Sequence, residues 1–82
     1  MATSLPELPS TEFDSKRIKR IRGALGLSQP EFAASVKVHV NSVIRWETGK
    51  AKPTRGDVIG RLLVAEQRAL TALQAASQGV ET

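Results

Sequence analysis

Residues 25–53, LGLSQPEFAASVKVHVNSVIRWETGKAKP, decide the fold of this 82-residue chain. The tetrapeptide SQPE at residues 28–31 has the spacing of a capping box, in which serine and glutamate side chains bond each other's backbone amides. Proline is tolerated there because first-turn amides have no helical partner. We therefore expect a short helix that starts at Ser28, ends near Val36 and turns Phe32 and Ala33 inward.

A second short helix is expected from about Val40 to Thr48, after a break at residues 37–39. Val43 and Trp46, three positions apart, would lie on its inward side. Gly49 should end it, because glycine easily adopts the left-handed conformation that follows many helices. Two short helices joined by three or four residues form the helix-turn-helix pattern, whose second helix fits the major groove of DNA.

The outward side chains at the start of this second helix would face base edges. Asparagine can bond adenine and arginine can bond guanine through paired hydrogen bonds, and an apolar side chain can touch a thymine methyl group. The predicted base contacts are His39, Val40, Asn41 and Arg45. A helix cap or a phosphate contact are alternative roles for His39, and Trp46 is expected in the core.

The segments on either side are also predicted to be helical. Thr11 and Asp14 have capping-box spacing, so we expect a flexible arm over residues 1–13 and a helix from Asp14 to Leu25. Thr54 and Asp57 repeat that spacing before a helix that begins near Arg55 and runs, with or without a break, to Ser77. The predicted fold class is all-α, a compact bundle of four to five helices.

Charge is concentrated in one part of the chain. Residues 16–55 contain ten basic and two acidic residues, although the whole chain carries a net charge of only +4. A basic block inside a folded domain indicates a polyanionic partner such as DNA. The alternative is a solvated surface without a partner.

Composition excludes several classes of protein. The chain has no cysteine and one histidine, so disulfides are excluded, and we expect no metal site and no cofactor. No nucleophile–base set or phosphate-binding glycine loop is present, so we do not expect an enzyme. No apolar run is long enough to span a bilayer and no export signal is visible, which predicts a cytoplasmic protein without membrane contact.

Residues 18–53, IKRIRGALGLSQPEFAASVKVHVNSVIRWETGKAKP, resemble the lambda-repressor/Cro-like helix-turn-helix proteins, the XRE family. The matching motifs are LGLSQ, EFA, the apolar-Ile-Arg-Trp-Glu run, and Gly-Lys followed by Lys-Pro. They occur at the right mutual spacing, and the resemblance covers about residues 16–64. One departure is Lys37, where the family usually has a glycine in the turn; a non-glycine residue there costs on the order of 1 kcal/mol.

The resemblance implies specific roles. The second helix of the motif would be the recognition helix, and Arg22 would pair with Glu47 inside the domain. Amides at the start of the preceding helix would also attract phosphate. The predicted phosphate contacts are Gln29, Lys50, Lys52 and Arg55.

The C-terminal part is richer in apolar residues than one small core needs. We therefore divide the chain into the arm, a DNA-binding domain over residues 14–64 and a helical extension over residues 65–82 with a frayed end. Leu63, Leu70 and Leu73 follow a heptad-like spacing and are predicted to form a homodimer interface. The alternative is a helix packed on its own domain.

These features predict a dimeric regulator that binds a palindromic site on double-stranded DNA, most simply as a repressor or autoregulator. Two other functions stay open. The chain could be an antitoxin that binds a toxin and represses its own operon, or a coactivator-like adaptor that acts mainly through protein contacts.

Overall fold

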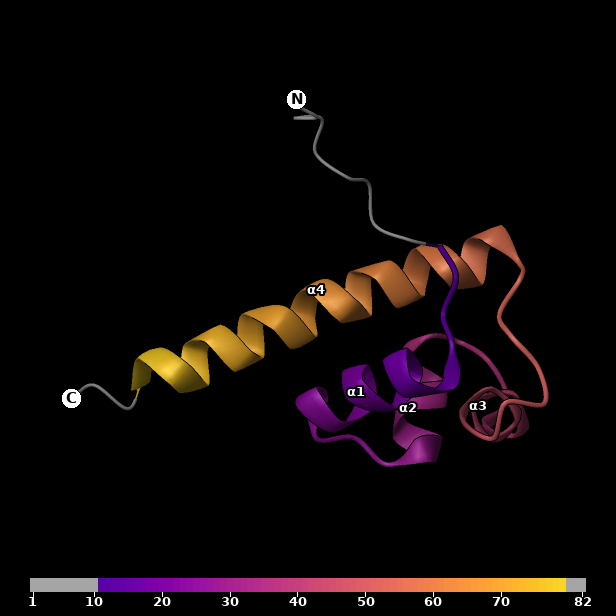
Figure 1. Ribbon diagram of the computed structural model, residues 1–82, viewed down its shortest axis with the longest axis horizontal. Coiled ribbons are helices and arrows are strands. Elements are labelled where there is room, and N and C mark those ends of the chain that lie inside the picture. The colour runs from indigo at the N-terminus through magenta and orange to yellow at the C-terminus, as the bar shows by residue number, and fades with distance from the viewer. Residues whose placement is uncertain (1–10, 80–82) are drawn as a thin grey trace, which may run out of the picture.

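The computed structural model describes residues 11–79, with side chains described as far as residue 76; most of the predicted arm, residues 1–10, lies outside this range. Within the described residues the fold is all-helical, as predicted. In Figure 1, α4 crosses one side of the molecule above the other three helices, and its C-terminal half extends beyond them. The helices are α1 (Ser15–Leu25), α2 (Gln29–Ser35), α3 (Val40–Glu47) and α4 (Gly56–Gly79).

The core lies between α4 and the three short helices. Its largest fully buried side chains come from every helix and from the segment before α1, which explains how so short a chain closes a core. The buried apolar residues are Phe13, Ile18, Ile21, Phe32, Ala33, Val36, Val43, Trp46, Val58, Leu62, Ala65 and Ala69.

The entry into α1 differs from the sequence prediction in two ways. Asp14, not Thr11, is the N-cap, and its carboxylate accepts a hydrogen bond of 2.8 Å from the Arg17 amide. Phe13, which the sequence assigned to the flexible arm, is only 1% exposed and belongs to the core. An aromatic ring gains too much from burial to remain in water when a helix face is within reach.

Arg17 holds this entry segment against α4. Its guanidinium donates to both carboxylate oxygens of Glu66 at 2.8 and 2.7 Å and to the Glu12 carbonyl at 3.0 Å. The same group lies 3.9 Å from the centre of the Phe13 ring, a cation–π geometry. The sequence analysis treated Arg17 only as part of the basic block, whereas the structure makes it a structural residue that joins α1 to α4.

The helix-turn-helix itself forms as the sequence predicts. Ser28 caps α2, and the reciprocal bond from the Ser28 amide to the Glu31 side chain, 2.8 Å long, completes the capping box. In the turn, Lys37 has a φ of 60°, the left-handed conformation that glycine adopts at low cost. The chain therefore keeps the usual turn geometry with a strained residue in it. Gly49, with a φ of 80°, follows α3 as expected.

Helix α4 is one continuous element, which settles a point that the sequence left open. It begins at Gly56, and no hydrogen bond from Thr54 caps it among the described residues, so the third predicted capping box is wrong. The Asp57 carboxylate instead lies 3.4 Å from Arg55 and 3.5 Å from Arg61. A side chain that already faces two guanidinium groups gains little by turning back to the helix start. No helix in the described part of the chain is both long enough and apolar enough to cross a membrane.

Candidate nucleic-acid interface

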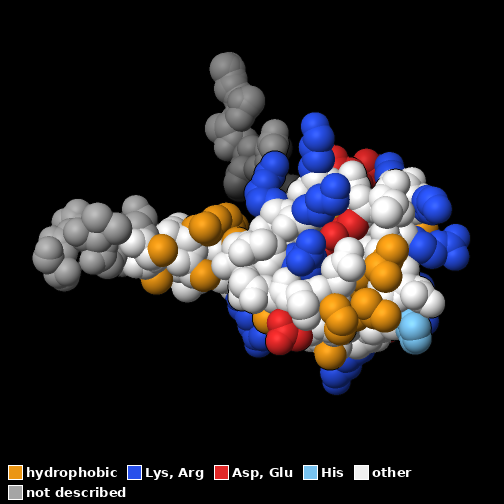
Figure 2. Space-filling view, turned by 90° about the horizontal axis from the view of Figure 1, so that it is seen from below, with side chains coloured by type: hydrophobic (Ala, Val, Ile, Leu, Met, Phe, Trp, Pro, Cys, Tyr) orange, Lys and Arg blue, Asp and Glu red, His pale blue; other side chains and the backbone are white. Residues whose placement is uncertain are grey.

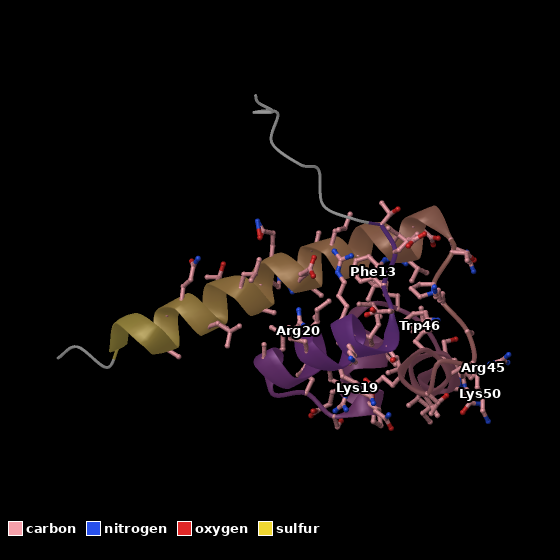
Figure 3. All side chains as sticks on the ribbon, in the orientation of Figure 1. Phe13, Lys19, Arg20, Arg45, Trp46 and Lys50 are labelled. Carbon is pink, nitrogen blue, oxygen red and sulfur yellow. The ribbon has the colours of Figure 1, made fainter. Side chains whose placement is uncertain are left out.

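Helix α3 presents opposite sides to the core and to the surroundings. Val43 and Trp46 are buried, whereas Asn41 and Arg45 are exposed. In Figure 3, Arg45 and Lys50 lie together on the side of α3 away from α1, and Trp46 lies between α3 and α4. The helical repeat of 3.6 residues produces this division, because residues 43 and 46 share a side that residues 41 and 45 do not.

His39 and Val40, also predicted to contact bases, both have structural roles. The His39 ring caps α3, since its Nδ1 accepts a hydrogen bond of 3.1 Å from the Asn41 amide. The proton of the neutral ring then sits on Nε2, which remains a donor. Val40 is partly buried against the core, so only part of its side chain is available to a partner.

Ile44 is a surface feature of α3 that the sequence analysis did not single out. Its side chain is 38% exposed, one turn after Val40. An exposed apolar side chain beside the polar residues of a recognition helix can meet a thymine methyl group. The i, i+4 spacing from Val40 was the available signal.

The loop after α3 is tied to the helix through one backbone oxygen. The Arg45 carbonyl accepts hydrogen bonds from the Lys50 amide at 2.9 Å, the Ala51 amide at 3.3 Å and the Thr48 hydroxyl at 3.2 Å. Lys50 and Lys52 are both exposed on this loop. Their backbone is therefore held while their side chains stay in solvent, an arrangement suited to electrostatic contact with phosphate.

Gln29 lies where α2 begins, but its side chain is partly engaged. Its Nε2 donates to Glu47 at 3.1 Å, which leaves the second N–H and the Oε1 atom of the amide for a partner. The amides nearby are less available than the sequence analysis expected. The Ser28 and Glu31 amides are used by the capping box, Pro30 has none, and only the Gln29 amide has no acceptor among the described residues.

Glu47 is the buried centre of this corner of the domain. Arg22 donates to its two carboxylate oxygens at 2.6 and 3.1 Å, and to the Leu27 carbonyl at 3.1 Å. Burial opposes ionisation of Glu47, but hydrogen bonds from Arg22 and Gln29 outweigh it, and the pKa of Glu47 is lowered. The pair expected between Arg22 and Glu47 is thus present, and it includes Gln29 as a third member.

Lys19 is an exposed basic residue that the sequence analysis did not place at the interface. Its charge helps to lower the pKa of Glu47, which puts it near the corner formed by Gln29 and α3. In Figure 3, Lys19 and Arg20 lie on different sides of α1, and Arg20 is the one nearer α4. On the face shown in Figure 2, lysine and arginine side chains are spread over the globular part of the molecule, with acidic side chains at a few places among them.

The three leucines predicted to form a dimer interface are placed unequally. Leu63 is partly buried and packs against the core. Leu70 and Leu73 are 50% and 51% exposed, on the part of α4 that extends beyond the other helices. Figure 2 shows hydrophobic side chains on this projecting part.

Among the described residues, no group of histidine, cysteine, aspartate or glutamate side chains could hold a metal ion. Comparison with known protein families matches residues 18–59 to the helix-turn-helix family. This range contains α2, α3, most of α1 and the first residues of α4. No curated protein and no solved structure matches the chain. The family match covers the whole of the motif described above, and the chain therefore belongs to the helix-turn-helix family of DNA-binding regulators.

Proposed function

We propose that this protein binds a specific sequence of double-stranded DNA by placing α3 in the major groove. The observation that carries the proposal is the exposure of Asn41 and Arg45 on a helix whose other side is locked in the core by Val43 and Trp46. A side chain can distinguish bases only if its backbone is held in place, and α3 meets that condition. Asn41 would bond adenine and Arg45 guanine, with Val40 and Ile44 near thymine methyl groups.

Phosphate contacts would position the helix in the groove. Lys50 and Lys52 extend from the loop tied to the Arg45 carbonyl, and Arg55 is exposed just before α4. Gln29, at the start of α2, would add a contact from a second helix, with its amide oriented by Glu47. Phosphate contacts from several segments around a recognition helix would fix its register on the duplex without selecting a sequence themselves.

We propose further that two copies bind together through the projecting part of α4. A helix of this length spans about 36 Å, and half-exposed leucines in water are unfavourable unless something covers them. A second copy would cover Leu70 and Leu73 and place a second α3 on the next half-site, about 34–36 Å away. Such a dimer bound over a promoter would exclude polymerase, so repression is the expected effect on transcription.

Selection from a pool of randomised double-stranded DNA at physiological salt, followed by sequencing, tests the base contacts. We expect enrichment of a motif with two-fold symmetry. The Arg45→Ala variant should enrich a motif that is less defined at one position in each half. Weak binding to all sequences, equal for both proteins, would contradict sequence-specific recognition.

Sedimentation equilibrium of the free protein tests the dimer. Leu70→Asp and Leu73→Asp should each shift the chain to a monomer. Val64→Asp is the matched control, because Val64 is 54% exposed and lies on the opposite side of α4 from Leu73. If all three variants associate like the parent chain, the leucines do not form the interface, and this face of α4 is open to a different protein such as a toxin.

A further inference from the structure

A recess of about 520 Å³ opens between the turn before α3, the inner side of α3 and the beginning of α4. Its volume lies within the range of small-molecule sites, about 300–1,000 Å³. The sequence analysis did not anticipate it, because its walls come from three segments separated along the chain. Trp46 and Val58 line its apolar part, and in Figure 3 Trp46 lies between α3 and α4 at this position.

The charged groups around the recess are mostly positive. Four lysine and arginine side chains line it and one carboxylate opposes them. These cations come from the turn, the loop after α3 and the first turns of α4: Lys37, Lys52, Arg55 and Arg61. Four like charges around one hollow repel each other, and a bound anion would relieve this repulsion.

The protein itself neutralises this charge incompletely. Asp57 lies 3.4 Å from Arg55 and 3.5 Å from Arg61, distances longer than those of strong charge-assisted hydrogen bonds. Within residues 11–79, neither Lys37 nor Lys52 has an acidic partner. The recess therefore holds more positive charge than its own acidic residue satisfies.

Uncharged donors complete the lining. Ser42 faces the recess from α3, and its hydroxyl group forms no hydrogen bond in the described structure. His39 lines the same recess, and the N–H of its Nε2 remains free because Nδ1 is used as the cap. Hydroxyl and imidazole N–H groups beside guanidinium and ammonium groups form a donor set that suits phosphate oxygens.

We propose that this recess is a phosphate-binding site. The phosphate comes either from the DNA backbone or from a small phosphorylated molecule. The first source rests on the proposed DNA binding and would extend that interface to Lys37 and Arg61. The second makes the recess a regulatory site, because Lys52 and Arg55 would be occupied by the small molecule and withdrawn from DNA.

Titration with inorganic phosphate at constant ionic strength tests the site directly, without DNA. Trp46 is the single tryptophan of the chain and lines the recess, so its fluorescence reports binding. We expect a saturable change, accompanied by amide shifts of Val38 and Ser42 in nuclear magnetic resonance spectra. Arg61→Ala should weaken binding about two- to fivefold, the range for loss of one exposed ion pair, and Asp57→Asn should strengthen it.

Arg68→Ala is the matched control, since it also removes one arginine from α4 but does not line this recess. Binding that is non-saturable, or weakened equally by Arg61→Ala and Arg68→Ala, would overturn the proposal. DNA titrations then identify the source. If Arg61→Ala lowers DNA affinity and reduces the salt dependence by about one ion, the DNA backbone occupies the recess. If Arg61→Ala weakens phosphate binding but leaves DNA affinity unchanged, the occupant is a small molecule.

Discussion

Arg22 of α1 and Glu47 at the end of α3 form a two-pronged ion pair, with hydrogen bonds of 2.6 and 3.1 Å. The Glu47 side chain is 4% exposed and the Arg22 side chain 26% exposed, so the pair lies at the edge of the core. Because Glu47 also accepts from Gln29, one carboxylate joins three helices at the end of the recognition helix. The stability of the domain and the position of its proposed DNA contacts therefore depend on a single group.

Arg22→Met should destabilise the fold by about 3 kcal/mol, because it leaves the Glu47 carboxylate buried with too few partners. Urea unfolding followed by circular dichroism measures this. Lys16→Met, at an exposed position of the same helix, should change stability very little. The double change Arg22→Met with Glu47→Leu should recover most of the loss, and a double variant as unstable as the single one would show that the charge is not the cause.

Stability should fall in acid. Hydrogen bonds from Arg17 lower the pKa of Glu66, and the net effect on Glu47 is also a pKa below the ordinary value of 4.5. A carboxyl group with a lowered pKa in the folded state stabilises the protein above its unfolded pKa and loses this contribution as pH falls through the folded pKa. The free energy of unfolding should be level near neutral pH and decrease below about pH 4.5.

Glu66→Gln provides the check on that pH dependence. Its unfolding free energy should decrease less steeply in acid than that of the parent chain, since residue 66 no longer titrates. Equal slopes for the two proteins between pH 5 and pH 3 would mean that the Arg17–Glu66 pair makes no contribution.

Lys37→Gly should stabilise the protein by roughly 0.5–1 kcal/mol. The left-handed conformation at φ 60° costs a lysine about 1–2 kcal/mol, and glycine removes this strain. Glycine also makes the unfolded chain more flexible, which offsets part of the stabilisation. Thermal unfolding measures the difference. Lys50→Gly is the control, because Lys50 has no positive φ and should lose stability. A less stable Lys37→Gly protein would argue that the lysine side chain makes a contribution larger than the strain.

Phe13→Ala should lower the free energy of unfolding by about 3 kcal/mol, the loss expected when a fully buried aromatic side chain is removed. The same substitution also removes the ring over which the Arg17 guanidinium lies. Val64→Ala, at a half-exposed position outside the proposed dimer interface, should leave the stability nearly unchanged. If Phe13→Ala were as mild as Val64→Ala, the segment before α1 would not be part of the folded unit.

Arg45→Ala and Lys52→Ala should weaken DNA binding in different ways. Loss of Arg45 should weaken the free energy of binding to the selected DNA site by about 1–3 kcal/mol and relax the preference at one base pair. Loss of Lys52 should lower affinity for every sequence and reduce the slope of affinity against salt by about one. Binding isotherms at several salt concentrations separate the two. An Arg45→Ala protein that weakens all sequences equally would make Arg45 a phosphate contact.

Local signals in the sequence were sufficient for the helices of the motif. The Ser28 capping box, Gly49 and the spacing of Val43 and Trp46 act over a few residues, because caps and helical faces depend on neighbours within one or two turns. The all-helical class, the motif and its family could therefore be predicted. The exposed positions of Asn41 and Arg45 follow from the same periodicity.

Contacts between distant residues were decided only by the tertiary structure. Nothing near Phe13 in the sequence indicates that its ring is buried, and Arg17 and Glu66, which form an ion pair, are 49 positions apart. Asp57, which fits a capping box by spacing, faces Arg55 and Arg61 instead. The cationic recess likewise exists only where the turn, α3 and α4 meet. Sequence patterns specify what each segment can form by itself, whereas burial and charge pairing depend on which segments the folded chain places side by side.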